Sequence, residues 1–356
     1  TLKWNLESIQ KGGYPRFILK EIFEQPKAIE NTFSGRLIYR NKTIKLSGLD
    51  DLAGRIDNFR RIIIIGCGTS WHAGLVGEYL IEKLARIPVE VEYASEFRYR
   101  NPIISQDDLV IVISQSGETA DTLEALKIAK RSGAHVFGIC NAVGSSIARE
   151  TFNGIYTHAG PEIGVASTKA FVTQIAALQM LALKLAKIKN TLTKQEFSNY
   201  FDELKAVPAI INQILKSSDK IKTIASNFFN TRNALFLGRG FNFPVALEGA
   251  LKMKEISYIH SEGYPAAEMK HGPIALVDED MPIIIIATKK GNYEKIVSNV
   301  QEIKSRRGKV ISIITEGDHI VKKLSDDFIE IPKSNEIFTP FYATIPLQLL
   351  SYYVAI

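Results

Sequence analysis

Residues 109–122 read LVIVISQSGETADT, an uninterrupted aliphatic run that ends in a turn rich in hydroxyl groups. Buried parallel strands have continuous runs of this kind, whereas half-exposed strands alternate between apolar and polar residues. A helical pattern follows from Ala120 to Ser132. The stretch therefore predicts a strand, a turn and a helix of an α/β fold. The turn would lie at the carboxyl end of the strand, where open α/β sheets bind ligands.

The turn combines three hydroxyl side chains, those of Ser114, Ser116 and Thr119, with Gln115 and Gly117. The first amide groups of the following helix have no partner within that helix, and they form the positive end of its dipole. Together these donors favour an anion. Because the chain has no GxxxxGK[ST] motif, we expect the phosphate of a small monoester rather than a nucleoside triphosphate. The alternative is a simple helix cap provided by Ser116 or Thr119.

A second strand, turn and helix lie upstream of the first. Residues 62–65 are four isoleucines, and they are followed by the turn Gly66-Cys67-Gly68-Thr69-Ser70 and another helical pattern. Neighbouring strands of a parallel sheet lie about 4.8 Å apart. We therefore expect the hydroxyls of Thr69 and Ser70 to face the same pocket as the turn at Ser114.

The pattern Gly66-x-Gly68 after a strand permits another interpretation. A dinucleotide-binding fold has Gly-x-Gly-x-x-Gly at this place and an acidic residue about 20 residues later, where this chain offers Glu90 and Glu92. The third glycine is absent, because Trp71 stands in its position and is too large for close packing of helix on strand. The sequence therefore disfavours a nicotinamide cofactor.

The second half of the chain repeats the first. Residues 234–240 (ALFLGRG) correspond to residues 62–68 at an offset of about 172 residues, and two further strand patterns keep nearly the same offset. We therefore expect two doubly wound parallel-sheet domains in tandem, of the αβα, flavodoxin-like type, each with about five strands. The second copy has Thr288-Lys289-Lys290-Gly291 in place of the hydroxyl-rich turn, so we expect the phosphate in the first copy only.

These patterns divide the chain into four predicted segments. They are a linker with a helical lead-in at 1–45, a first domain at 46–190, a helical connector at 191–222 and a second domain at 223–356. Val89–Tyr93 is expected to be a strand near the edge of the first sheet, and Ile155–His158 its last short strand. A single amphipathic helix is expected from Phe17 to Thr32.

Composition excludes several classes of protein. The 356 residues contain two cysteines, Cys67 and Cys140, which fit a reducing compartment and exclude a disulfide framework or a cysteine zinc site. The net charge of +6 is small beside 44 basic and 38 acidic residues, and no basic cluster interleaves with aromatic residues as a nucleic-acid site requires. No apolar run reaches the length of a membrane span. We expect a cytoplasmic protein that binds neither membrane nor nucleic acid and holds no metal.

Titratable residues gather in the second domain. Glu248, Lys252 and Glu255 fall on one face of a helix predicted from about Pro244 to Tyr258. An exposed Glu–Lys pair on a helix surface is the ordinary interpretation of such spacing. Downstream, residues 260–273 bring two histidines, His260 and His271, together with acids in a stretch of low apolar content that we expect to be a loop. A carboxylate and an imidazole suit acid–base chemistry on a ketose.

Five motifs now stand in order along the chain. They are CGTS at 67–70, SQSGETADT at 114–122, EIGVASTK at 162–169, LEGALKMKE at 247–255 and EMKHGP at 268–273. Together they resemble the isomerase domain of the glutamine:fructose-6-phosphate aminotransferases, with its paired sugar-isomerase domains. The resemblance covers almost the whole chain, and the lead-in KEIFEQP at 20–26 is similar to the start of that domain.

The resemblance implies an activity and a binding site. The family converts fructose 6-phosphate and ammonia to glucosamine 6-phosphate without metal or redox cofactor, and glucose 6-phosphate is a related ligand. By position, the phosphate and nearby hydroxyls would be held by Ser70, Ser114, Gln115, Ser116 and Thr119. The sugar would be lined by Cys67, Gly68, Thr69, Val165, Ala166 and Ser167.

The resemblance also implies catalytic roles. Glu255 matches the base that moves a proton between C1 and C2, and Lys252 and Glu248 match residues that assist this transfer. His271 matches the histidine that opens the sugar ring. In the family that histidine acts across a subunit interface, so a homodimer is implied.

Two parts of the family pattern lie outside this sequence. Neither cysteine begins the chain, so we expect no glutaminase domain here and no hydrolysis of glutamine, although the full-length protein would carry that domain at its N-terminus. The sequence also stops at Ile356, before the family's C-terminal tail with its Schiff-base lysine.

Two other functions stay open. A non-catalytic sugar-phosphate sensor would need the hydroxyl turns but not Glu255, Lys252 and His271, whose joint presence favours an enzyme. A related isomerase or deglycase of another amino-sugar phosphate would differ only in its substrate.

Overall fold

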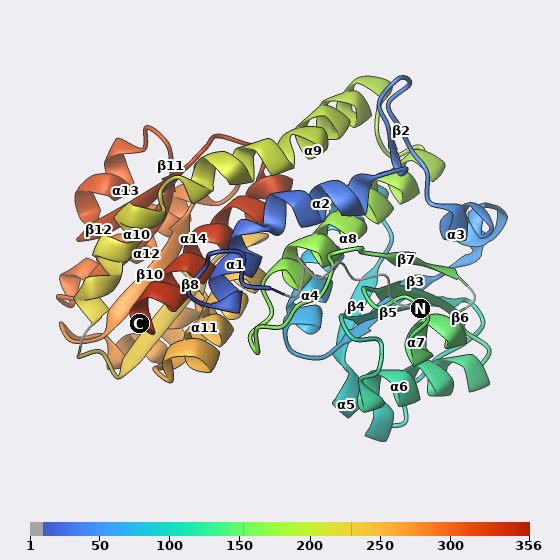
Figure 1. Ribbon diagram of the computed structural model, residues 1–356, viewed down its shortest axis with the longest axis horizontal. Helices are drawn as coiled ribbons and strands as arrows, with labels where there is room; N and C mark the ends of the chain where they lie inside the picture. Colours follow the sequence, from blue (N-terminus) through green and yellow to red (C-terminus); the bar gives the residue numbers. More distant parts are fainter. Residues whose placement is uncertain (1–9, 152, 229) are drawn as a thin grey trace. The chain divides into compact units, whose positions relative to one another are not determined.

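The computed structural model describes residues 10–151, 153–228 and 230–356. They divide into two compact units (Figure 1). The first unit consists of Glu24–Ile163 and Ser167–Lys205 with residues 10–13, and the second of Tyr14–Phe23, Gly164–Ala166 and Ala206–Ile356. The boundary at Lys205 falls within the helix α9 (Lys194–Leu215).

The first unit is built on a five-stranded parallel sheet in the order β4-β3-β5-β6-β7. Its strands are β3 (Arg61–Gly66), β4 (Val89–Tyr93), β5 (Asp108–Ser114), β6 (His135–Cys140) and β7 (Asn153–Tyr156). The sheet is preceded by a short antiparallel pair, β1 (Leu37–Ile38) and β2 (Thr43–Ile44). β4 lies at an edge, as the alternating sequence of Val89–Tyr93 predicted.

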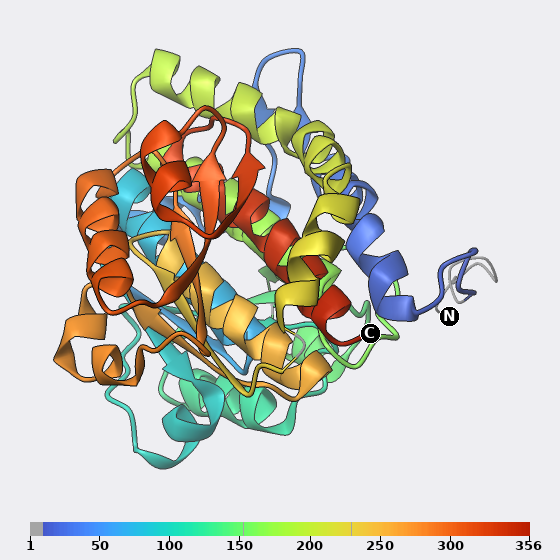
Figure 2. The same cartoon turned by 90° about the vertical axis from the view of Figure 1, so that its left-hand side faces the viewer.

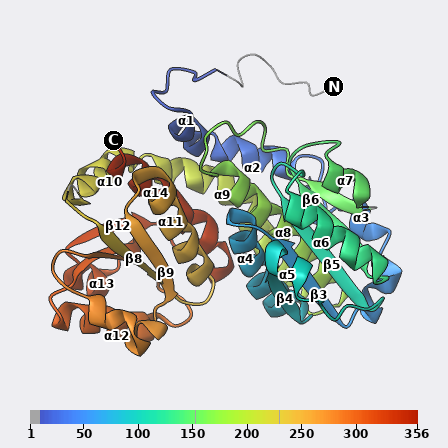
Figure 3. The same cartoon turned by 90° about the horizontal axis from the view of Figure 1, so that it is seen from below.

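Helices cover both faces of this sheet (Figure 3). On one face, side chains of β3, β5 and β6 pack against α5 (Ala94–Tyr99), α6 (Ala120–Arg131) and α7 (Ser146–Glu150). On the other, Ile64 lies against Gly74 and Gly77 of α4 (Thr69–Ala85), and α4 packs on α8 (Lys169–Ile188). The remaining helices of this unit are α2 (Gln25–Phe33), α3 (Ser47–Asp50) and the 3₁₀ turn η2 (Ala53–Asn58).

The second unit repeats this architecture. Its parallel sheet has the order β9-β8-β10-β11-β12, the same sequence of neighbours as in the first unit. Its strands are β8 (Asn233–Gly238), β9 (His260–Pro265), β10 (Pro282–Ala287), β11 (Lys309–Thr315) and β12 (Asp327–Ile331). The prediction of two tandem doubly wound domains is therefore confirmed.

Helices again lie on both sides (Figure 2). One face packs against α12 (Tyr293–Ser305) and α13 (His319–Leu324), and the other against α11 (Asn242–Ser257) and α14 (Thr339–Val354). The unit also contains α1 (Phe17–Phe23) and α10 (Ser218–Ala225). Its short 3₁₀ turns are η3 (Ser226–Phe228), η4 (Glu268–His271), η5 (Pro273–Leu276) and η6 (Glu336–Phe338).

Two local predictions were wrong. The single helix expected from Phe17 to Thr32 is two helices, α1 and α2, because Pro26 has no N–H to continue the hydrogen bonds of α1 and instead stands in the first turn of α2. The stretch from His260 to Tyr264, expected to be a loop, belongs to the edge strand β9. Gly263 lets α11 pack flat on that strand, since a Cβ there would lie 2.8 Å from Cα of Leu247.

α8 is long and apolar enough to cross a membrane by length and composition alone. However, 83% of its most apolar window is buried inside the protein. Its apolar character is therefore explained by a core position, as its packing on α4 and α2 requires.

A buried ion pair joins the starts of two central strands of the first sheet. Asp108 is fully buried, and its carboxylate accepts hydrogen bonds from Arg61 Nε at 3.0 Å and from the Ser105 amide at 2.8 Å. Burial alone would raise the pKa of Asp108, but the hydrogen bonds from Arg61 and Ser105 and the nearby positive charges lower it below its usual value. The ionised form therefore stabilises the fold.

We predict that Asp108→Asn lowers the free energy of unfolding by about 2 kcal/mol at pH 7, because the hydrogen bonds to a charged acceptor are weakened. A depressed folded-state pKa means that this contribution is complete above the ordinary aspartate value of 3.8 and is lost as the pH falls through the folded-state value. Urea unfolding of both proteins between pH 7 and pH 3 measures the difference. Asp57→Asn, at an exposed ion pair with Lys189, is the control. A difference that grows toward pH 3 would contradict the assignment.

Candidate functional site

The hydroxyl-rich turn lies where the sequence predicted it, between β5 and α6. The strand ends at Ser114 and the helix begins at Ala120, so the five residues between them sit at the carboxyl edge of the sheet beside a 12-residue helix. Ser114 is buried, whereas Ser116 is exposed and Thr119 is half-buried. The turn therefore presents side chains to the solvent from a rigid base.

Hydrogen bonds within the turn shape it. Ser114 Oγ accepts the amide of Gly117 at 2.9 Å and lies 3.2 Å from Oγ1 of Thr119. Ser116 Oγ accepts the amide of Glu118 at 3.2 Å. Gly117 has φ of +66°, a conformation that glycine adopts without strain. Thr119 is the N-cap residue, yet its side chain makes no capping hydrogen bond to the described part of α6. The simple cap interpretation is thus disfavoured for Thr119.

The start of α7 supports the turn through hydrogen bonds. The carbonyl of Gly117 accepts the amide of Ile147 at 2.9 Å, and the Glu118 carboxylate accepts the amide of Ser146 at 2.8 Å. Hydrogen bonds from the backbone and side chain of Ser146 lower the pKa of Glu118. The ionised carboxylate therefore links the turn to the start of α7. Ser145 fills the space beside Gly117, where a Cβ would lie 1.9 Å from its Oγ.

The turn between β3 and α4 adjoins the first one, because β3 and β5 are neighbours in the sheet. Cys67 Sγ lies 3.7 Å from Oγ1 of Thr122 in α6, which places the two turns side by side as predicted. Ser70 is buried, and its Oγ accepts Nε2 of Gln174 at 3.0 Å. Ser70 Oγ is thus an acceptor for α8. Gln174 lies on α8, and no motif in the sequence pointed to it.

The third predicted element, residues 164–167, precedes α8. Val165 is fully exposed, Ala166 is buried and Ser167 is half-buried. Glu162 prepares the start of α8, because its Oε1 accepts the amides of Thr168 at 2.8 Å and Ala170 at 3.1 Å. Two amides at the start of this helix are thus engaged by a protein carboxylate.

In the second unit, α11 carries the predicted acid–base group. Lys252 is 1% exposed, and its Nζ lies 2.5 Å from Oε2 of Glu255 and 3.4 Å from Oε1 of Glu248. Glu248 is buried as well, whereas the Glu255 side chain is 35% exposed. The ordinary interpretation, a solvated pair on a helix surface, does not fit such burial. Of the three side chains in this cluster, Glu255 is the one that reaches solvent.

The two histidines are not equivalent. His260 begins the edge strand β9, and its Nε2 lies 3.7 Å from Oε1 of Glu262. His271 is the last residue of η4, beyond the other end of that strand, and it is exposed. Of the two, only His271 follows the carboxyl end of the strand.

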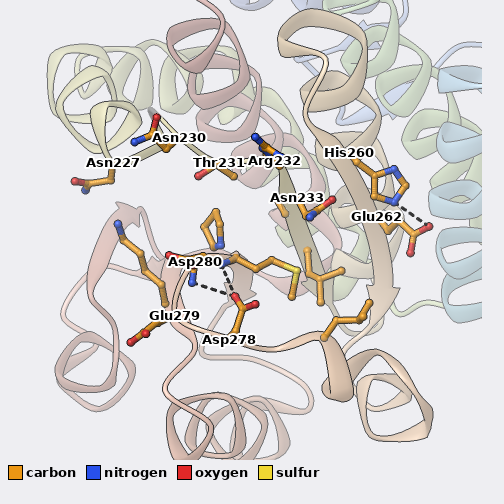
Figure 4. A pocket seen from close by; sticks show the side chains of 16 residues that line it. Asn227, Asn230, Thr231, Arg232, Asn233, His260, Glu262, Asp278, Glu279 and Asp280 are labelled. Atoms are coloured by element: carbon orange, nitrogen blue, oxygen red, sulfur yellow. Dashed lines mark hydrogen bonds and ion pairs between the residues drawn. The ribbon is translucent and has the colours of Figure 1, made fainter.

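A polar hollow of about 660 Å³ lies in the same unit (Figure 4). Its lining includes the starts of four strands, at Asn233, His260, Pro282 and Lys309, and the acidic loop Asp278–Asp280. The cluster on α11 and His271 are not part of this lining. Because open α/β sheets bind their ligands at the carboxyl ends of the strands, this hollow is not the predicted site.

No group of three or more His, Cys, Asp and Glu side chains among residues 10–151, 153–228 and 230–356 is arranged to hold a metal ion. The structure does gather two other sets of polar groups. In the first unit they are hydroxyl and amide groups, and in the second they are two carboxylates around an ammonium. The first set suits a phosphate and the second suits proton transfer.

Comparisons with known proteins identify the family to which the chain belongs. The SIS domain family matches residues 56–184 and 227–356. Glutamine–fructose-6-phosphate aminotransferases [isomerizing] of Chlorobaculum tepidum and Bacteroides thetaiotaomicron are 59% and 55% identical over 99% of this chain. The chain spans 58% and 57% of the length of these two curated relatives.

Solved structures with a similar fold include proteins that act on sugar phosphates by name. The C-terminal domain of glucosamine-fructose-6-phosphate aminotransferase from Francisella tularensis has a TM-score of 0.91 and 44% identity, over 97% of both chains. A glucosamine-6-phosphate deaminase from Thermotoga maritima has a TM-score of 0.75 at 24% identity over 96% of this chain and 94% of its own, which is a likeness of fold alone.

We predict that the double variant Ser116→Ala and Thr119→Ala weakens binding of glucose 6-phosphate by at least tenfold, because two hydrogen bonds to a charged group, each of about 1.5 to 3 kcal/mol, are removed. Isothermal titration calorimetry measures the affinity. The control is Thr223→Ala with Ser298→Ala, which removes exposed hydroxyls that donate to helix carbonyls in the other unit. Unchanged affinity in the first variant would show that the phosphate binds elsewhere.

Proposed function

Because the chain belongs to the SIS domain family and matches the C-terminal isomerase domain of glutamine–fructose-6-phosphate aminotransferases, we propose that it converts fructose 6-phosphate and ammonia to glucosamine 6-phosphate and water. The observation that carries this proposal is the buried cluster on α11, in which Lys252 lies between Glu248 and Glu255. A protein that only bound a sugar phosphate would have no need of such a group.

The phosphate of the substrate would bind at the turn between β5 and α6. Ser116 and Thr119 offer hydroxyls there, and the first amides of α6 add the positive end of the helix dipole. The Ser70 hydroxyl and the Gln115 side-chain amide complete the proposed set of donors. Fructose, glucose and glucosamine 6-phosphates share the phosphate that these groups recognise, so the same turn serves substrate and product.

The sugar would then lie against the turn between β3 and α4 and the loop before α8. Backbone and small side chains line such a surface without crowding a hexose. The lining residues of this proposal are Cys67, Gly68, Thr69, Val165, Ala166 and Ser167.

Glu255 would act as the base. Formation of the aldose requires a proton to leave C1 and a proton to arrive at C2, and one carboxylate can perform both transfers in turn. Lys252 orients Glu255 through the close contact of ammonium and carboxylate, and it offsets the negative charge of Glu248. The partial exposure of Glu255 gives the substrate access to the base, while the burial of its two partners fixes its position.

His271 would open the sugar ring, by moving a proton on the ring oxygen. Its exposure on η4 lets it reach a substrate bound to another copy of the chain, which supports a homodimer in which each subunit completes the site of the other. In the full-length protein an N-terminal glutaminase domain would supply the ammonia. The two cysteines are free thiols, which supports a cytoplasmic location.

We predict that Glu255→Gln in the full-length enzyme abolishes exchange of solvent deuterium into C2 of the product, because the amide cannot accept the proton from C1. Binding of fructose 6-phosphate should remain within about twofold of wild type, since the phosphate and hydroxyl contacts are untouched. Proton NMR measures the exchange and calorimetry the affinity.

The matched control is Glu294→Gln, an exposed acid in the first turn of α12 in the same unit. It should exchange at the wild-type rate. Wild-type exchange in Glu255→Gln would instead assign the base to another residue, with Glu248 the next candidate.

A further inference from the structure

One contact within the second unit reaches the proposed sugar site from a helix that has no role in the function described above. Glu21 lies on α1, and its side chain is buried, with the residue 2% exposed. Both of its carboxylate oxygens accept the amide of Gly164, Oε1 at 3.1 Å and Oε2 at 3.2 Å. Gly164 begins the segment Gly164–Ala166, which belongs to the same unit.

The identity of residue 164 fits this contact. A Cβ at Gly164 would lie 2.6 Å from Oε2 of Glu21 and 3.6 Å from Cα of Ile18. A side chain at residue 164 would therefore push the carboxylate away from the amide. The backbone here has no positive φ that would call for glycine, so the space occupied by Glu21 is the reason for the residue.

The other end of the loop is held separately. Glu162 accepts the amides of Thr168 and Ala170, which fixes the beginning of α8. Between these anchors Val165 is fully exposed and has no packing to hold it. The conformation of the lining residues thus depends on carboxylates bonded to backbone amides at both ends, and Glu21 provides the one on the N-terminal side.

We propose that Glu21 is a positioning residue for the sugar: its carboxylate holds the amide of Gly164 so that residues 165–167 keep the conformation that lines the bound hexose. The inference rests on the proposed function, because that function makes these residues part of the site. The phosphate turn at Ser114–Thr119 belongs to the other unit.

The proposal separates two parts of the ligand. Loss of the Glu21 contact disturbs the surface that meets the hexose and leaves the hydroxyl turn at Ser114–Thr119 unchanged. A change in general stability would not distinguish a sugar phosphate from a phosphate ion. Comparing the two ligands therefore isolates a positioning role.

The experiment measures binding of glucose 6-phosphate and of inorganic phosphate by calorimetry in wild type, Glu21→Ala, Glu21→Gln and Gly164→Ala. Glu21→Ala and Gly164→Ala should each weaken glucose 6-phosphate by about tenfold and leave inorganic phosphate within twofold, because one charge-assisted contact is lost. Glu21→Gln keeps one acceptor oxygen, so its affinity should fall between wild type and Glu21→Ala. In the full-length enzyme, the same variants should raise KM for fructose 6-phosphate more than they lower kcat.

The control is Glu30→Ala on α2, an exposed acid paired with Lys27, which should change neither affinity. Circular dichroism establishes that each variant is folded, and Gly164→Ala tests the contact with Glu21 itself intact. Equal loss of both ligands, or no loss of glucose 6-phosphate in either variant, would overturn the role of Glu21 alone. Failure of wild type to bind glucose 6-phosphate would overturn both this role and the proposed function.

Discussion

A parallel sheet buried on both faces imposes the main constraint on this protein. Helices must cover both faces, so each strand is followed by a turn and a helix, and all of these turns meet at the carboxyl edge. The tight start of the helix after the first strand needs glycine. A Cβ at Gly66 would lie 2.9 Å from the backbone of Ser70, and one at Gly238 would lie 2.1 Å from the backbone of Asn242. Both copies obey the same rule, and the site follows from it.

The two copies use that edge differently. In the first copy, Ser116 and Thr119 lie in the turn itself, where Ser116 is exposed and Thr119 is half-buried. In the second, Thr288 is buried and accepts a hydrogen bond from Asn242 at 2.9 Å, and the following amide of Lys289 is bonded to Thr315 at 3.0 Å. In the corresponding turn of the second copy, the Thr288 hydroxyl and the Lys289 amide are therefore engaged by the protein's own side chains, and the residues that we propose as functional in this copy lie on α11 and η4.

Burial of charge is the other physical feature of the proposed active site. Removing an ammonium and a carboxylate from water is costly, and a buried ion pair seldom repays that cost in stability. Lys252 and Glu248 are buried nonetheless, and the partner that reaches solvent is Glu255. The arrangement makes sense as a fixed support for one reactive carboxylate. Carboxylates also have a supporting role in the loop before α8. Glu21 and Glu162 accept hydrogen bonds from backbone amides there and hold a segment that has little packing of its own.

The sequence by itself determined the central strands of both sheets, the repeat and the position of the hydroxyl turn, because continuous aliphatic runs such as residues 109–113 directly encode burial in a parallel sheet. It also placed Glu248, Lys252 and Glu255 on one helix face, because helix geometry is local. Only the tertiary structure decided that Lys252 is enclosed, that β9 is a strand, and that Gln174 and Glu21 bond Ser70 and Gly164. The bonds of Gln174 and Glu21 join residues more than one hundred positions apart. The enclosure of Lys252 depends on the packing of α14 against α11, and β9 depends on backbone pairing at a sheet edge. No local pattern of apolar and polar residues records such contacts.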